Sequence, residues 1–164
     1  DATLDEVSVA RLWWFGEWSA AHGDTVRLAA IAGRMRQRVA ISGLAADAVP
    51  ARAMAARLLL ARGDTAAAIE TLRALLPVAP MGPLIWGYWE PLSAERLLLA
   101  RLLLATGRPA EAMRVAETFD GPRSGTDLAF LPHSLDLRRE AAQRMGDRAK
   151  DAALARRQEG LAHR

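Results

Sequence analysis

The sequence from residue 92 to residue 119 constrains the fold most strongly and reads LSAERLLLARLLLATGRPAEAMRVAETF. Its first half carries leucine on more than one helical face, so a helix here must be covered on more than one side. Gly107 suits the positive φ that ends a helix, and Pro109 suits the first turn of the next one. The second half repeats apolar residues at steps of three and four, which predicts a helix with one narrow apolar face. The whole stretch is therefore predicted to form a helical hairpin that packs between neighbours.

The turn of this hairpin recurs elsewhere in the chain. The segments AAHGDT, LARGDT, LATGRP and QRMGDR place a glycine at positions 23, 63, 107 and 146. The spacing of about 40 residues predicts a series of helix-turn-helix units. We expect one domain over residues 1–164, with hairpins at about 3–43, 48–76, 92–120 and 132–161.

Several helix ends are marked by local signals. Thr3 followed by Glu6 has the spacing of a capping box, which predicts the start of the first helix. Asp24 is placed to cap the second helix, and Gly43 to end it. After the loop DGPRSGTDLAFLP, a helix is expected to open near Pro132.

Residues 77–91, PVAPMGPLIWGYWEP, interrupt the helical pattern. Four prolines remove backbone donors and disfavour the helical conformation of the residues before them. The segment is also too apolar for a flexible linker. We expect an irregular loop that packs over the ends or a groove of neighbouring helices.

A single hairpin cannot bury both sides of LLLARLLLA, whereas neighbours on either side can. The predicted fold is therefore all-α, with about four antiparallel helical hairpins stacked on one another. With Gly63 as a turn glycine, other residues fall at positions typical of the tetratricopeptide repeat: Ala68, Leu72, Leu75 and Pro80, with Gly107, Ala112 and Phe119 in the next unit.

The chain thus resembles the tetratricopeptide repeat family. The match is best in the two central hairpins, whereas the outer hairpins are degenerate repeats. The repeat period exceeds the roughly 34 residues of the family. The segments LLLARGDTAAAI and LLLATGRPAEAM also resemble repeat regions of large bacterial proteins, some of them attached to serine/threonine kinases. The resemblance implies a right-handed α-solenoid whose first helices line a concave surface that binds other proteins.

The register of that resemblance assigns residues to the groove. Arg57 and Arg101 take equivalent positions on the first helices of the second and third hairpins. Trp13, Glu17 and Glu140 take comparable positions in the two outer hairpins. Arginine and tryptophan supply many interface hot spots. We therefore expect these five residues to bind a partner protein.

Two other surfaces compete with the groove. Arg27, Arg34 and Arg38 share one face of the second helix, and such a basic face suits anionic lipid or an acidic protein. The tryptophans of the first helix crowd too closely for one apolar face to hold them all. They are expected either to be buried under the 77–91 loop or to form an exposed aromatic patch.

Composition excludes several classes of function. With no cysteine, the chain has no thiolate nucleophile, cysteine zinc site or disulfide. Acids and bases alternate and the net charge is only +3, so nucleic acid is not the expected partner. No apolar run reaches the roughly 18 residues of a membrane span. The chain begins with Asp1, which we interpret as a processed or excised end, and the compartment stays undecided.

No enzyme motif stands out. The three histidines lack the spacing of metal ligands, and the common metal, calcium and nucleotide motifs are absent. His133 and Ser134, near Asp127 and Asp136, contain the groups of a nucleophile site, but the preferred interpretation is that they cap the first turn of a helix. We expect no catalytic residue, metal or cofactor.

The leading hypothesis is a non-catalytic scaffold for protein–protein interaction. It would be a subunit of a larger assembly or the interaction region of a longer bacterial protein. The first alternative is a regulatory or sensor module attached to an enzyme such as a kinase. The second is a peripheral subunit that docks at a membrane surface through its basic or aromatic face, and nucleic-acid binding is a further, less favoured hypothesis.

Overall fold

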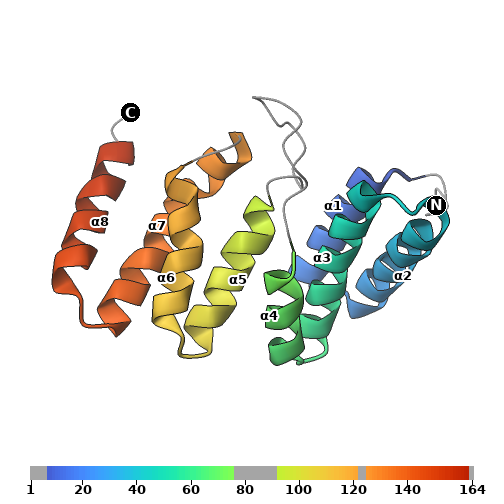
Figure 1. The fold of residues 1–164 in the computed structure, drawn as a ribbon, viewed down its shortest axis with the longest axis horizontal. Coiled ribbons are helices and arrows are strands. Elements are labelled where there is room, and N and C mark those ends of the chain that lie inside the picture. The colour runs from blue at the N-terminus through green and yellow to red at the C-terminus, as the bar shows by residue number, and fades with distance from the viewer. Residues whose placement is uncertain (1–6, 76–91, 122–124, 163–164) are drawn as a thin grey trace. The chain divides into compact units, whose positions relative to one another are not determined.

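A computed structural model describes residues 7–75, 92–121 and 125–162 (Figure 1). Over these ranges the chain forms eight α-helices and one short 3-10 helix, with no β-strand. The all-α class is therefore confirmed. The helices belong to two compact units, unit 1 (residues 1–78) and unit 2 (residues 79–164), which are described separately. The expectation of one domain over the whole chain stays a prediction.

Unit 1 is built from four helices, and each packs against the next, while α1 also contacts α3. Consecutive helices run in opposite directions (Figure 1). The helices are α1 (Val9–Ala21), α2 (Thr25–Ser42), α3 (Ala45–Ala61) and α4 (Thr65–Arg73). The largest side chains buried between them are those of Leu12, Trp13, Leu28, Ile31, Met35 and Met54.

Unit 2 repeats this arrangement, since each helix packs on the next and α5 also contacts α7. Its elements are α5 (Ser93–Ala105), α6 (Pro109–Glu117), the 3-10 helix η1 (Thr118–Asp120), α7 (Gly125–Arg144) and α8 (Arg148–Ala162). Phe119, Leu103 and Leu135 are its largest fully buried apolar side chains apart from Leu92. Leu98 and Leu102 of α5 are half-buried, so its leucines do occupy more than one face.

The four predicted turns are confirmed. Gly23, Gly63, Gly107 and Gly146 have φ of 70°, 84°, 76° and 74°, a conformation that side chains with a Cβ rarely adopt. The Asp24 carboxylate accepts a hydrogen bond from the backbone N–H of Arg27 at 2.9 Å, as expected of an N-cap. Gly43 ends α2 with φ 64°, and Pro109 opens α6, both as predicted.

Two helix boundaries differ from the prediction. The first helix is capped by Ser8, whose Oγ accepts a hydrogen bond from the Arg11 N–H at 3.4 Å. The predicted capping box at Thr3 and the 77–91 loop lie outside the described residues. The helix expected to open near Pro132 begins at Gly125 instead, so Pro132 lies inside α7. Proline removes one helical hydrogen bond. Asp127 and Leu131, which both precede Pro132, are buried, and their burial favours the longer helix.

Candidate functional site

The predicted groove residues fall in both units. Trp13, Glu17 and Arg57 belong to unit 1, whereas Arg101 and Glu140 belong to unit 2. Each group is therefore considered within its own unit.

In unit 2, a polar groove lies between the first helices of the two hairpins, α5 and α7. It encloses about 350 Å³ and brings Arg101 and Glu140 to the same site. The two helices contribute Arg101, Leu104 and Ala105 from α5, and His133, Asp136, Leu137, Glu140 and Arg144 from α7. Leu104 and Leu137 are buried and form its floor, and the charged residues are exposed at its rim. We call this site the α5–α7 groove.

The charges of the α5–α7 groove are only partly paired. Arg144 forms an ion pair with Glu140 at 2.6 Å and donates to the Leu104 carbonyl at 2.5 Å, which joins α7 to the end of α5. Asp136 accepts from Gln158 of α8. Arg101 has no hydrogen-bond or ion-pair partner within the described part of the chain. Its guanidinium can therefore bind a carboxylate or a backbone carbonyl of a ligand without first breaking an internal pair.

Nucleophilic chemistry at His133 and Ser134 is not supported by their positions. Ser134 is fully buried and its Oγ donates to the Ala116 carbonyl at 3.1 Å, whereas His133 is exposed on the groove. The interpretation as helix caps was also wrong, because α7 begins at Gly125 and both residues lie in its middle. Among the described residues, no group of three or more histidine, aspartate or glutamate side chains is arranged to hold a metal ion.

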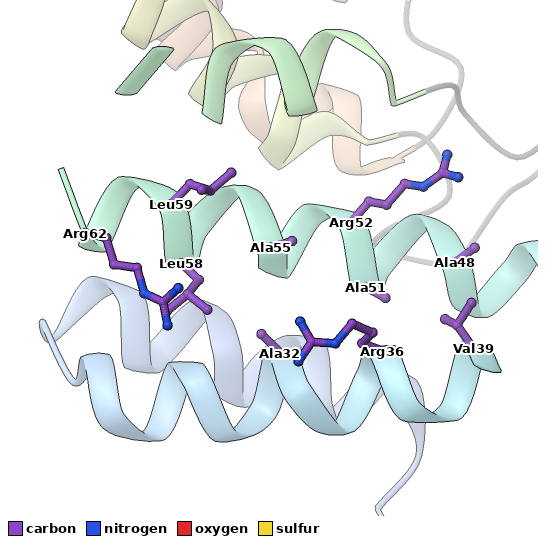
Figure 2. Close-up of a pocket in the computed structure, with 10 residues that line it drawn as sticks. All are labelled: Ala32, Arg36, Val39, Ala48, Ala51, Arg52, Ala55, Leu58, Leu59 and Arg62. Carbon is purple, nitrogen blue, oxygen red and sulfur yellow. The ribbon is translucent and has the colours of Figure 1, made fainter. Parts of the chain in front are cut away.

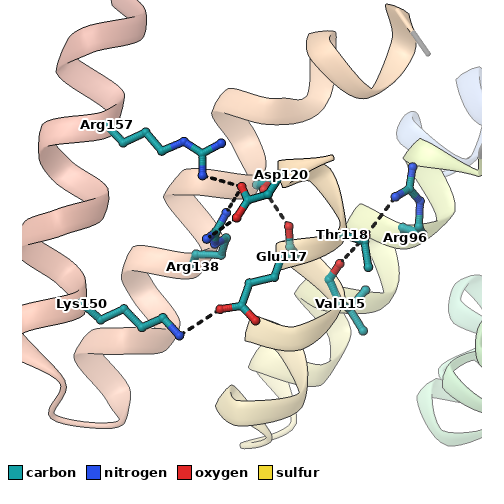
Figure 3. Close-up of polar contacts among 10 residues, drawn as sticks. Arg96, Val115, Glu117, Thr118, Asp120, Arg138, Lys150 and Arg157 are labelled. Carbon is teal, nitrogen blue, oxygen red and sulfur yellow. Dashed lines mark hydrogen bonds and ion pairs between the residues drawn. The ribbon is translucent and has the colours of Figure 1, made fainter. Parts of the chain in front are cut away.

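Buried polar contacts hold α7 against α5 and so fix the groove. Asp127 is completely buried and accepts from Ser93 Oγ of α5 at 2.5 Å. It also pairs with Arg96, one turn further along α5. Arg96 in turn donates to Thr118 Oγ1 at 2.9 Å (Figure 3). Its guanidinium lies 4.5 Å from the centroid of the Phe119 ring.

A second cluster joins the other face of α7 to η1 and α8. Asp120 accepts from Arg138 of α7 at 2.6 Å and from Arg157 of α8 at 2.5 Å, and Lys150 pairs with Glu117 at 2.9 Å (Figure 3). Burial raises the pKa of Asp120, but the hydrogen bonds and positive charges of the two arginines outweigh it, so this pKa lies below its usual value. Asp120 is thereby held ionised between two helices.

The predicted groove residues of unit 1 are not free for binding. Trp13 is 4% exposed and packs edge to face on Trp14, with 5.1 Å between ring centroids, so its assignment to the groove surface is corrected. Glu17 and Arg57 form an ion pair between α1 and α3, and their side chains are only 20% and 13% exposed. This pair holds two first helices together, which is a structural role.

The predicted basic face on α2 is also engaged internally. Arg34 donates to Gln37 Oε1 at 2.7 Å, and Arg38 donates to the Val7 carbonyl at 2.6 Å. Arg27 lies 5.6 Å from the Phe15 ring centroid and 5.8 Å from that of Trp18. The three arginines therefore do not form one free basic stripe.

The remaining tryptophans of α1 do reach the surface. Trp14 and Trp18 are 49% and 51% exposed, with Phe15 beside them at 39%. The Trp18 ring stacks on His22, with 4.1 Å between ring centroids. The alternative of an exposed aromatic patch thus describes these side chains. Trp13 is buried instead, and the 77–91 loop that was expected to cover the tryptophans lies outside the described residues.

Sequence reasoning missed part of the α5–α7 groove. The sequence pattern assigned His133 to a helix cap or a nucleophile site and Asp136 to the surroundings of that site, and it assigned no role to Arg144. His133, Asp136, Glu140 and Arg144 follow the three- and four-residue steps of one helical face. This spacing is the signal in the sequence that predicts one shared surface for them.

No protein-family model, curated protein or solved structure matches this chain. In the part of the chain that the structure describes, no helix combines the length and apolar character needed to cross a membrane.

Proposed function

We propose that this protein is a non-catalytic interaction module that binds a segment of another protein in the α5–α7 groove. The proposal includes the stacking of its hairpins into a right-handed, tetratricopeptide-like solenoid. The protein would serve as a subunit of a larger assembly or as the interaction region of a longer chain.

The observation that carries the proposal is the pairing of α5 and α7 around a polar groove. In stacked hairpins the first helix of each pair lines the binding surface, and α5 and α7 hold that place in unit 2. The groove offers the Arg101 guanidinium, which has no partner among the described residues, together with the carboxylates of Asp136 and Glu140. Donors and acceptors over a leucine floor suit a peptide segment with polar and apolar side chains.

The volume also favours a peptide over a large rigid ligand. About 350 Å³ is at the small end of ligand sites, enough for a few side chains of a partner. Such a partner would donate to Asp136 or Glu140 and accept from Arg101.

Charge reversal at Arg101 tests the proposal. The protein and its Arg101→Glu variant would be used to purify partners from a bacterial lysate, with quantitative mass spectrometry of the bound proteins. We expect the recovery of at least one stoichiometric partner to fall tenfold or more with Arg101→Glu, because a donor is replaced by a third carboxylate in the groove, beside Asp136 and Glu140.

The matched control is Arg114→Glu on α6. Arg114 is exposed, lies outside the groove and has no ion pair within the described residues, so the variant makes the same charge change. The partner should be retained by the control. Equal recovery by the Arg101 variant and the wild type would reject the α5–α7 groove as the binding site.

A second candidate function rests on the aromatic patch of α1. Trp14, Phe15 and Trp18, with Arg27 beside them, have the composition of a surface that inserts at a membrane interface. Co-sedimentation with anionic vesicles, lost on Trp14→Ser and Trp18→Ser substitution, would support peripheral membrane docking. The alternative of a regulatory module would be favoured by a catalytic domain encoded in the same reading frame.

A further inference from the structure

A second groove, in unit 1, lies between α2 and α3 and differs in chemistry from the α5–α7 groove. It encloses about 410 Å³ (Figure 2). Its floor is apolar and comes mostly from α3, with Ala48, Ala51, Ala55, Leu58 and Leu59, while α2 adds Ala32 and Val39. We call this site the α2–α3 groove.

Three arginines surround this apolar floor. Arg36 rises from α2, Arg62 stands at the end of α3, and Arg52 projects from the opposite edge of α3 (Figure 2). All three are exposed, and none of their guanidinium groups has a hydrogen-bond or ion-pair partner in the described ranges. None of the described residues that line the groove is acidic. The site is therefore positively charged around an apolar centre, and it favours a ligand that is both acidic and apolar.

The shape of the floor selects among such ligands. The lining residues of α3 recur at steps of three and four from Ala48 to Arg62, so they follow one face of the helix. At 1.5 Å per residue this face is roughly 20 Å long, which matches a ligand helix of about four turns. The alanines lack bulky side chains, which lets the backbone of a second helix approach closely.

An extended peptide fits the site less well. Its backbone N–H and C=O groups would need partners, but the floor presents only alanine, valine and leucine side chains. A helix satisfies its backbone groups internally, so it can lie on such a floor without that penalty.

We propose that the α2–α3 groove binds an acidic amphipathic helix of a partner protein. The apolar face of this helix lies on the alanine and leucine floor, and its aspartate or glutamate side chains pair with Arg36, Arg52 and Arg62. Arg52 and Arg62 are ten residues apart on α3, so the matching carboxylates are separated by about 15 Å along the ligand. This surface is separate from the α5–α7 groove, so its test is independent of the function proposed above.

The probe is a fluorescent 18-residue synthetic helix with leucine and alanine at the i, i+3, i+4 and i+7 positions and glutamate elsewhere. Its control has lysine in place of every glutamate. Fluorescence anisotropy with the full chain is expected to show micromolar binding of the glutamate peptide and none of the lysine peptide. Binding is expected to weaken at least tenfold between 50 and 500 mM salt, because the ion pairs are exposed.

Variants locate the site. Arg52→Glu with Arg62→Glu should weaken binding of the glutamate peptide at least tenfold. The control pair, Arg11→Glu with Arg114→Glu, makes the same change of charge at exposed residues outside the groove and should leave binding unchanged. Ala55→Glu places a carboxylate on the floor itself and should abolish binding, whereas Ala152→Glu on α8 should not. Both alanines are exposed, so neither change disturbs a packed core.

Three results would overturn the proposal. The first is no binding of the glutamate peptide. The second is binding that the groove variants and control variants weaken equally. The third is a protein that binds vesicles of phosphatidylserine and phosphatidylcholine but not the glutamate peptide, and that loses vesicle binding on the Arg52 and Arg62 changes. This result would assign the groove to anionic lipid.

Discussion

Replacing Asp127 by alanine should destabilise unit 2 by about 3 kcal/mol. The Asp127 side chain is completely buried, and it accepts hydrogen bonds from Ser93 and Arg96 of α5. Ser93 is also completely buried, so its hydroxyl would lose its acceptor with no access to water. Leaving one buried hydroxyl unsatisfied costs about 1–3 kcal/mol.

The loss of charge adds to this cost. Removing one member of a fully buried ion pair costs about 3–5 kcal/mol. The cost of leaving Arg96 without Asp127 falls below that range, because the Arg96 side chain is 21% exposed and keeps its contacts with Thr118 and Phe119. Together, the two effects give the estimate of about 3 kcal/mol, which is several times the value of an exposed pair.

Urea denaturation of the full chain, followed by circular dichroism at 222 nm, measures this loss. With a slope of about 2 kcal/mol per molar urea, the midpoint should fall by about 1.5 M. Asp136→Ala on the same helix is the control, because Asp136 is exposed and should cost less than about 1 kcal/mol. A loss for Asp127→Ala no larger than that of the control would refute the idea that this carboxylate ties α7 to α5.

Three further changes test other parts of the packing. Leu103→Ala should reduce the free energy of unfolding by about 2–5 kcal/mol, because the Leu103 side chain is 1% exposed and a cavity remains. Leu102→Ala should cost less because Leu102 is half-buried, and equal losses in urea denaturation would contradict this difference. Gly16→Ala should lower the melting temperature, since its new Cβ would lie 2.1 Å from the Met54 sulfur, while Gly33→Ala in open space on α2 should raise it. Asp120→Asn should reduce stability at pH 7, because the lowered pKa of Asp120 stabilises the fold while the carboxylate is ionised. The deficit should begin to shrink as the pH falls below about 4 and disappear once the pH is below the lowered pKa of Asp120; a deficit at pH 3 as large as that at pH 7 would contradict the role of Arg138 and Arg157.

The sequence determined the features that depend on neighbouring residues. A turn at Gly107 followed by Pro109, or a cap at Asp24, requires only a local backbone conformation and one nearby donor or acceptor. The same holds for the all-α class, because apolar spacing along each segment predicts a helix without reference to the rest of the chain.

The tertiary structure decided what depends on residues far apart in the chain. The start of α7 could not be predicted, because Asp127 is held by Ser93, which lies 34 residues away, and this contact outweighs the signal of Pro132. Burial of Trp13 but not Trp14 follows from the positions of α2 and α3 around α1. For the same reason Arg57 of α3 is paired with Glu17, whereas the Arg101 side chain of α5, the first helix of the next hairpin, has no partner among the described residues. Helical spacing tells which side chains share a face, but only the packing of the helices determines which of those faces is left for a partner.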